Sequence, residues 1–131
     1  MIASTSYLRR VLAADAVASG ATGLLLAFGG DLLRGLTGLQ AEFNRPAGFF
    51  LIAYAAAVAW VASRALVHGG FVWAIIGINL VWSAESIVML VTGFLQPTAL
   101  GYAFVVAQAV VVAAFAQLEF MGLRRSERVA G

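Results

Sequence analysis

The sequence contains no cysteine and no lysine, a single histidine, and few charged residues, which make up 11% of its 131 residues. The lack of cysteine excludes disulfide bonds, thiol catalysis and thiolate metal sites. The single histidine, His68, excludes a haem held by two histidines of the same chain, and too few other ligands cluster around it to complete a metal site. We therefore expect neither a metal nor a cofactor.

The chain also lacks the motifs of familiar enzymes and of nucleic-acid-binding proteins. It has no nucleophile elbow, no phosphate-binding glycine loop and no pair of catalytic carboxylates in a water-accessible setting. All eight basic residues are arginines, and they do not form the stripe that a phosphate backbone requires. The sequence predicts a protein that is not an enzyme and does not bind nucleic acid.

What the sequence has in excess is hydrophobic residues, 63% of the total. They fall into four runs, each long enough for a helix that crosses the hydrocarbon core of a bilayer, which takes about 20 residues. These runs predict one all-α domain over residues 1–131, an integral membrane bundle of four transmembrane helices in up-down order. The expected spans are about 8–30, 46–67, 71–95 and 97–122.

The connection over residues 31–45 is longer than the others. Apolar residues recur in it at nearly helical spacing from Leu32 onward, opposite Asp31 and Arg34. This pattern is typical of a short amphipathic segment that lies in the headgroup region. Two glycines in the segment favour the alternative, a solvated loop. Pro46 then suits the first helical position of the second span.

The arginines beside the spans predict the orientation of the bundle. With four crossings, both termini and the second loop lie on one side of the membrane. Only Arg34 and Arg45 flank the opposite side. Because positively charged flanks stay in the cytoplasm, we expect a bacterial inner-membrane protein with both termini inside. The arginines on the cytoplasmic side are Arg9, Arg10, Arg64, Arg124, Arg125 and Arg128.

Two acidic residues are predicted at membrane depth near the cytoplasmic surface. Asp15 lies about two helical turns into the first span, and Glu119 lies at a similar level in the fourth. An ionisable group at this depth is costly unless it is paired or hydrated. We expect both acids to form ion pairs in an inner-leaflet charge cluster with Arg64 and Arg124. The alternative is a gate or a proton entry point.

Glu85 is predicted near the midplane of the third span or slightly beyond it, with Tyr54 and Gln108 at comparable depth in neighbouring spans. A protonated Glu85 that is hydrogen-bonded to either residue would satisfy both partners without a buried charge. Such an interhelical contact stabilises a bundle by about 1 kcal/mol. The alternatives are a proton-coupled binding site and a position facing lipid.

Three further polar or aromatic residues share one face of the third span, because they are spaced three and four apart. An aromatic ring flanked by amide and hydroxyl groups is typical of a small-molecule pocket. The alternative is that the amide and hydroxyl groups join helices and the ring fills a groove. The candidate intramembrane polar site is Asn79, Trp82 and Ser86 together with Glu85, Gln108 and Tyr54.

A faint internal repetition relates the two halves of the sequence. Offset by 64 residues, Asp15 and Ser19 correspond to Asn79 and Ser83. If the halves are related, two helical hairpins lie in the same orientation about an axis along the membrane normal. The alternative is chance matching in a sequence that uses few residue types.

Three stretches of the sequence carry a resemblance to known proteins: LRRVLAADAVASGATGLLL, WAIIGINLVWSAESIVML, and PTALGYAFVVAQA followed by AQLEFMGLRR. Through them the chain resembles small four-helix bacterial integral membrane proteins over nearly its full length, a resemblance that implies the fold but no activity. The chain is also similar to the small multidrug resistance transporters, whose essential first-helix acid would correspond to Asp15. That acid is a glutamate in the transporters and their loops are shorter than residues 31–45, so no substrate residues are carried over.

These observations predict a non-enzymatic membrane subunit or scaffold that packs against itself or a larger membrane partner. Small residues four apart on the first span, such as Ser19 and Gly23, allow a neighbouring helix to approach closely. The alternative is a proton-linked carrier or channel for a small hydrophobic or cationic solute, with Glu85 as its protonation site. The expected partners are the lipid bilayer and a second copy or another membrane protein, and a small-molecule ligand is left open.

Overall fold

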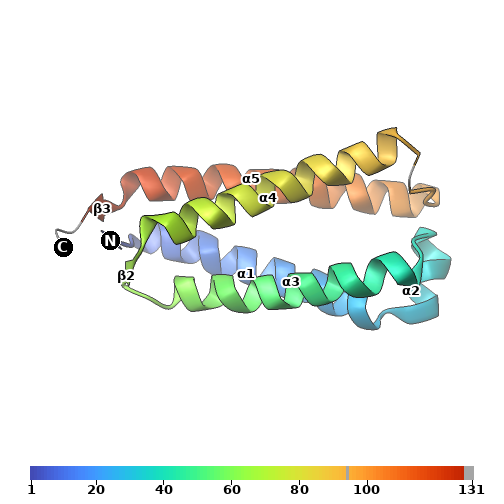
Figure 1. Ribbon diagram of the computed structural model, residues 1–131, viewed down its shortest axis with the longest axis horizontal. Coiled ribbons are helices and arrows are strands. Elements are labelled where there is room, and N and C mark those ends of the chain that lie inside the picture. Colours follow the sequence, from blue (N-terminus) through green and yellow to red (C-terminus); the bar gives the residue numbers. More distant parts are fainter. Residues whose placement is uncertain (94, 129–131) are drawn as a thin grey trace.

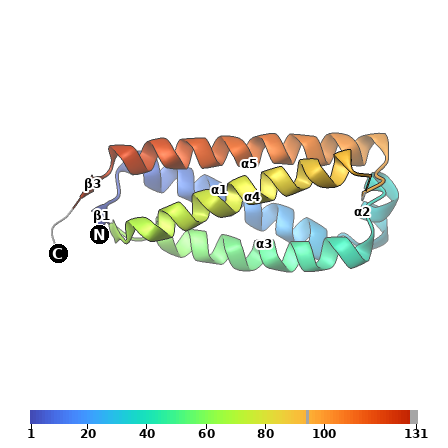
Figure 2. The ribbon, with the colours of Figure 1, turned by 45° about the horizontal axis from the view of Figure 1, so that its top comes forward.

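The computed structural model describes residues 1–93 and 95–128. In this part of the chain, four long helices run up and down: α1 (Ser6–Phe28), α3 (Ala41–Ala62), α4 (Gly69–Val91) and α5 (Ala99–Arg125). α1 packs along α3 and α4 packs along α5, so that two hairpins lie side by side (Figure 1 and Figure 2). The start of α1 and the end of α5 lie at one end of the bundle, which we call the terminal end, and we call the opposite end the loop end.

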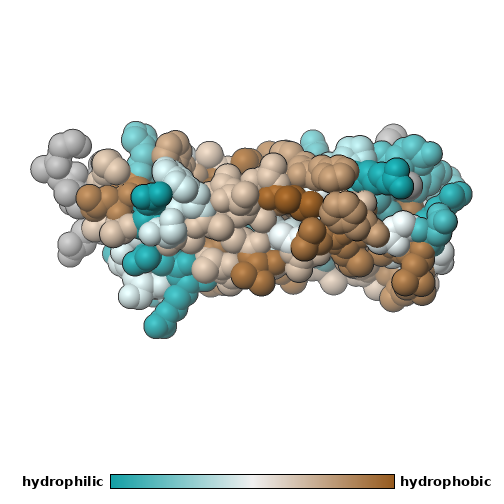
Figure 3. All heavy atoms as spheres, turned by 90° about the horizontal axis from the view of Figure 1, so that it is seen from below, coloured by the Kyte–Doolittle hydropathy of each residue, from teal (hydrophilic) through white to brown (hydrophobic). Residues whose placement is uncertain are grey.

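All four long helices are long and apolar enough to cross a membrane. Hydrophobic residues cover the middle of the face seen in Figure 3, and hydrophilic residues gather toward both ends. Large apolar side chains point outward from the long helices; in α1, Val17 is 72% exposed and Leu24 is 55% exposed. Such a surface is typical of a protein surrounded by lipid. The all-α class, the up-down order and four helices of transmembrane length are confirmed.

The predicted spans correspond to these helices, with shifted ends. α1 begins two residues before the predicted span because the Thr5 hydroxyl accepts the backbone N–H of Leu8 at 3.2 Å and caps the helix. α4 ends at Val91, two residues before Gly93, which has a φ of 77° that a right-handed helix does not continue through.

α3 begins five residues before Pro46, so the expectation that this proline occupies the first helical position is wrong. The missing N–H of Pro46 leaves the carbonyl of Glu42 without its usual helical donor. Because Glu42 is exposed at the loop end, water can hydrogen-bond that carbonyl and the cost of the proline is small.

The segment over residues 31–45 is divided between two elements. Its first part lies in α2 (Gly30–Thr37), a short amphipathic helix in which Leu33 is buried and Leu32 is 75% exposed. Residues from 41 onward belong to α3, so the expected short amphipathic helix is found over 31–37 but not over 41–45, and its place in the headgroup region stays a prediction. The Thr98 hydroxyl donates to the carbonyl of Leu36 at 2.6 Å and fixes α2 to the start of α5.

A small antiparallel sheet at the terminal end was not predicted. Its strands are ordered β2–β1–β3, with β1 at Ile2–Ala3, β2 at Leu66–Val67 and β3 at Glu127–Arg128. Ile2 is paired with Val67 on one side and with Arg128 on the other, so that the sheet connects the start, middle and end of the chain. Strands of two residues are too short to show an alternating pattern, which is why no pattern in the sequence predicts them.

α1 and α3 approach each other closely where both carry glycine. A side-chain carbon added at Gly23 would lie 2.9 Å from the carbonyl oxygen of Gly48, and one added at Gly48 would collide with the backbone of Ala27. The small residues of α1 are therefore used inside the chain, where they let the two helix backbones come together.

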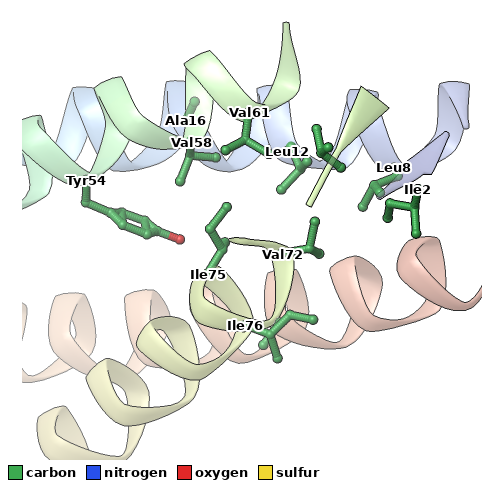
Figure 4. Close-up of a cluster of buried hydrophobic side chains, with 12 residues drawn as sticks. Ile2, Leu8, Leu12, Ala16, Tyr54, Val58, Val61, Val72, Ile75 and Ile76 are labelled. Atoms are coloured by element: carbon green, nitrogen blue, oxygen red, sulfur yellow. The ribbon is translucent and has the colours of Figure 1, made fainter. Parts of the chain in front are cut away.

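Aliphatic side chains fill the half of the bundle near the terminal end (Figure 4). In this aliphatic core, Leu8, Leu12, Val58 and Val72 are each 0% exposed. Tyr54 lies at the edge of the core, with its hydroxyl pointing from α3 into the space between the helices (Figure 4). The aliphatic core consists of Ile2, Leu8, Leu12, Ala16, Tyr54, Val58, Val61, Val67, Val72, Ile75, Ile76 and Ala116.

Candidate functional site

Every long helix contributes one buried polar side chain to a single site between the helices. Asp15 of α1 and Glu119 of α5 are 1% and 0% exposed, and Tyr54 of α3 and Asn79 of α4 are also buried. We call these four residues the acid cluster. They lie six to ten residues from the terminal ends of their helices, or roughly 9–15 Å at a rise of ~1.5 Å per residue.

Tyr54 and Asn79 connect the two acids. The Tyr54 hydroxyl lies 2.8 Å from Oδ2 of Asp15 and 2.9 Å from Oδ1 of Asn79. The Asn79 amide donates to Oδ2 of Asp15 at 3.1 Å and to Oε1 of Glu119 at 2.7 Å. Ser19, one turn along α1, donates to Oδ1 of Asp15 at 3.0 Å. Both carboxyl groups therefore lie within hydrogen-bond distance of the same amide nitrogen, Nδ2 of Asn79.

The contacts of the acid cluster require more hydrogens than its neutral donors supply. Ser19 and Tyr54 each carry one hydroxyl hydrogen, and Asn79 carries two amide hydrogens. These four hydrogens serve five contacts, because the Tyr54 hydroxyl faces two acceptors with a single hydrogen. A proton on Asp15, donated to Tyr54 while Tyr54 donates to Asn79, completes all five.

Glu119 supplies a second indication of a bound proton. Its Oε2 atom is buried without a hydrogen-bond partner, and a buried carboxylate oxygen that lacks a donor is costly. A proton on either acid lowers the charge of the pair from two negative charges to one. Because Asp15 and Glu119 both accept from the Asn79 amide, a proton on either acid lies in the same site.

The arginines that were expected to pair with these acids lie elsewhere. The guanidinium of Arg64 is 4.9 Å from the centre of the Trp60 ring, and that of Arg124 is 5.7 Å from the centre of the Phe120 ring. Both are cation–π contacts near the terminal end, where long side chains reach water. The predicted inner-leaflet cluster is correct in bringing the two acids together and wrong in giving them these arginines as partners.

A second polar group, which we call the amide group, joins α4 to α5 nearer the loop end. Trp82 donates its indole N–H to Oε1 of Gln108 at 2.8 Å, and the Gln108 amide donates to the Ser86 hydroxyl at 3.0 Å. The Ser86 hydroxyl in turn donates to the carbonyl of Trp82 at 2.8 Å. The candidate site predicted from the sequence is therefore divided: these three residues meet here, whereas Tyr54 and Asn79 belong to the acid cluster.

Glu85 belongs to neither group. Its side chain is exposed on α4, beside a shallow groove that is also lined by Phe50. The expected hydrogen bond of Glu85 to Tyr54 or Gln108 is wrong, and the outward-facing alternative is the one found. The reason is helix rotation: the next residue, Ser86, faces inward, and successive residues are turned by about 100° around a helix.

Small cavities lie between the acid cluster and the loop end. A cavity of about 50 Å³ is lined by Ser19, Thr22, Trp82 and Gln108 among others. A cavity of about 30 Å³ shares Thr22, Trp82 and Gln108 with it and extends to Ser86. Each is larger than the roughly 10–15 Å³ that one water molecule needs. The second cavity shares Leu39, Phe43 and Leu95 with a hollow of about 460 Å³ at the loop end.

Ser19 was not singled out as a site residue from the sequence. The available signal was its position four residues after Asp15, because residues four apart lie on the same helix face. The repetition at an offset of 64 gave another signal, since it aligns Asp15 with Asn79 and these two residues are hydrogen-bonded.

No protein-family model, curated protein or solved structure matches this chain. Within residues 1–93 and 95–128, no three His, Asp or Glu side chains gather in a way that could hold a metal ion. The function must therefore be argued from the geometry of the acid cluster and its surroundings.

Proposed function

We propose that this chain is a multi-pass protein of the bacterial inner membrane that acts as a non-enzymatic, proton-linked carrier or channel for a small hydrophobic or cationic solute. The Asp15–Glu119 pair is its proton-binding site. The observation that carries the proposal is the meeting of two buried carboxyl groups, from α1 and α5, whose hydrogen-bonding neighbours are the neutral side chains of Ser19, Tyr54 and Asn79.

The energetic cost of this arrangement supports a functional role. An ionised acid in the membrane interior is costly, and two of them repel each other in a medium of low dielectric constant. Apolar residues of similar volume can replace a buried charged group without loss of stability. A pair of acids at this position is therefore better explained by reversible protonation than by the need to hold four helices together.

The proposed orientation places both termini in the cytoplasm. Arg9, Arg64 and Arg124 lie at or near the terminal end, together with most of the other arginines, and positively charged flanks remain on the cytoplasmic side. The acid cluster then lies in the cytoplasmic half of the bilayer, and the amide group lies farther toward the periplasm.

Proton movement into proteoliposomes tests the proposed function. The protein is reconstituted with a trapped pH-sensitive dye, an inside-negative potassium potential is applied, and tetraphenylphosphonium is present or absent as a cationic probe solute. The wild-type protein should move protons under at least one of these conditions. Asp15→Asn and Glu119→Gln should each lower the rate at least tenfold, because neither amide can accept and release the proton.

Glu85→Gln is the matched control. It removes a carboxyl group from another membrane-spanning helix, α4, and that group does not contact the acid cluster. Its proton movement should equal that of the wild type. The proposal fails if wild-type vesicles move protons no faster than empty liposomes under both conditions. It also fails if Glu119→Gln and Glu85→Gln behave alike.

A second candidate is the membrane subunit or scaffold, which one observation favours. The exposed carboxyl of Glu85 lies beside an apolar groove at a depth where a carboxyl group gains from a partner. Ala74 and Gly77 also line this groove, and small residues allow another helix to approach α4 closely. The small-residue face of α1 gives no comparable support, because α3 covers it within the chain.

A further inference from the structure

The acid cluster has different surroundings on its two sides. Toward the terminal end it borders the aliphatic core, where Leu8, Leu12, Val58 and Val72 are all 0% exposed. The small sheet closes that end by pairing β1 with β2 and β3. A hollow of about 650 Å³ at the terminal end is lined by residues such as His68 and Arg124, and the aliphatic core separates it from the acids. This side is sealed by hydrocarbon.

Toward the loop end the surroundings contain space, and a few polar side chains stand among apolar ones. Ser19, which donates to Asp15, also lines the cavity of about 50 Å³. That cavity and the one of about 30 Å³ share the walls formed by Thr22, Trp82 and Gln108. Hydroxyl, indole and amide groups therefore stand beside spaces that are each large enough for a water molecule, in the direction of the hollow at the loop end.

We propose that protons reach the Asp15–Glu119 pair from the loop end, through these two cavities, and that Gln108 controls their passage. The proposal rests on the proposed function, because it assigns the access route of the same proton-binding site. A proton enters as hydronium on water in the cavities and is passed through the Ser19 hydroxyl to a carboxylate oxygen of Asp15. Water remains behind, and one O–H bond is broken for each that forms.

Gln108 is suited to this control because it stands in the wall of both cavities. Its amide is held by Trp82 on one side and by Ser86 on the other. A further contact from its amide to the Val105 carbonyl, at 3.0 Å, fixes the side chain on α5. An apolar side chain at this place would remove the amide that lines both cavities, and a buried water molecule needs two to four polar partners.

Silver ions, which are small and react with thiols, test the access route. Because the chain has no cysteine, a single introduced cysteine is the only thiol of each variant, and the cysteine-free wild type measures the reaction of silver with other groups. Thr22→Cys and Ala18→Cys place it in the cavity wall, and Ile75→Cys places it in the aliphatic core. Leu32→Cys, on an exposed residue of α2, marks with an impermeant maleimide which face of the vesicle carries the loop end.

Silver added at the loop-end face should react with the thiols of Thr22→Cys and Ala18→Cys at least tenfold faster than with the thiol of Ile75→Cys. It should also react with these two cavity thiols faster than silver that is added at the opposite face. Adding Gln108→Leu to Thr22→Cys should slow the reaction at least tenfold, whereas Gln108→Asn, which keeps the amide, should slow it less. Equal rates for the cavity and core thiols, or no effect of Gln108→Leu, would overturn the route. Silver access does not require proton movement, so loss of the proposed function leaves this result readable on its own.

Discussion

The two halves of this bundle are packed differently. The half near the terminal end is filled with aliphatic side chains and closed by a small sheet. The half near the loop end contains the amide group, a close approach of two helix backbones, and cavities. The acid cluster lies on the boundary between them. In our proposal, the sealed half fixes the position of the acids and the looser half gives access to them.

The largest effect is expected from Leu12→Ala, which tests whether the sealed half depends on complete filling. Leu12 is 0% exposed in the aliphatic core, and truncating such a leucine costs about 2–5 kcal/mol, including the cavity that it leaves. The measurement is unfolding of the reconstituted protein in mixed micelles. Leu25→Ala is the control, because Leu25 is 46% exposed on the outside of α1 and should change stability little. Equal losses for both variants would remove the distinction between core and surface.

A smaller effect is expected from Gly48→Ala, which tests how the looser half is held together. The added methyl group would collide with the backbone of Ala27, and overpacking of this kind costs about 1–3 kcal/mol. Gly77→Ala is the matched control, because a side-chain carbon at Gly77 meets nothing within 4 Å and alanine favours a helix over glycine. If Gly48→Ala is as stable as Gly77→Ala in the same unfolding experiment, the close approach of α1 and α3 does not hold this half.

The fold could be predicted from the sequence to the level of helices and their order, because the length and hydropathy of a span are properties of one segment at a time. The ends of the helices were harder to predict from the sequence. Pro46 was expected to begin α3, whereas the helix starts five residues earlier. The sheet could not be found, since strands as short as Ile2–Ala3 form only when distant segments meet.

The residues of the candidate site were predicted from the sequence, but which of them contact each other was not. Asp15, Glu119, Tyr54 and Asn79 were all identified, yet they were assigned to two different levels and the acids were given arginine partners. Which residues meet depends on the rotation of each helix about its axis, which hydropathy does not fix. Glu85 illustrates the limit: its depth was estimated from the sequence, but one residue of rotation separates it from the inward face of Ser86.

The most direct test of the account is infrared spectroscopy of the carbonyl stretch of protonated carboxylic acids, measured on the reconstituted protein at neutral pH. One proton held by the Asp15–Glu119 pair predicts a carboxylic acid band that Asp15→Asn and Glu119→Gln each shift or weaken, because each removes one of the two carboxyl groups of the buried site, and that Glu85→Gln leaves in place. A spectrum in which neither Asp15→Asn nor Glu119→Gln changes this band would contradict the claim that the buried pair holds a proton.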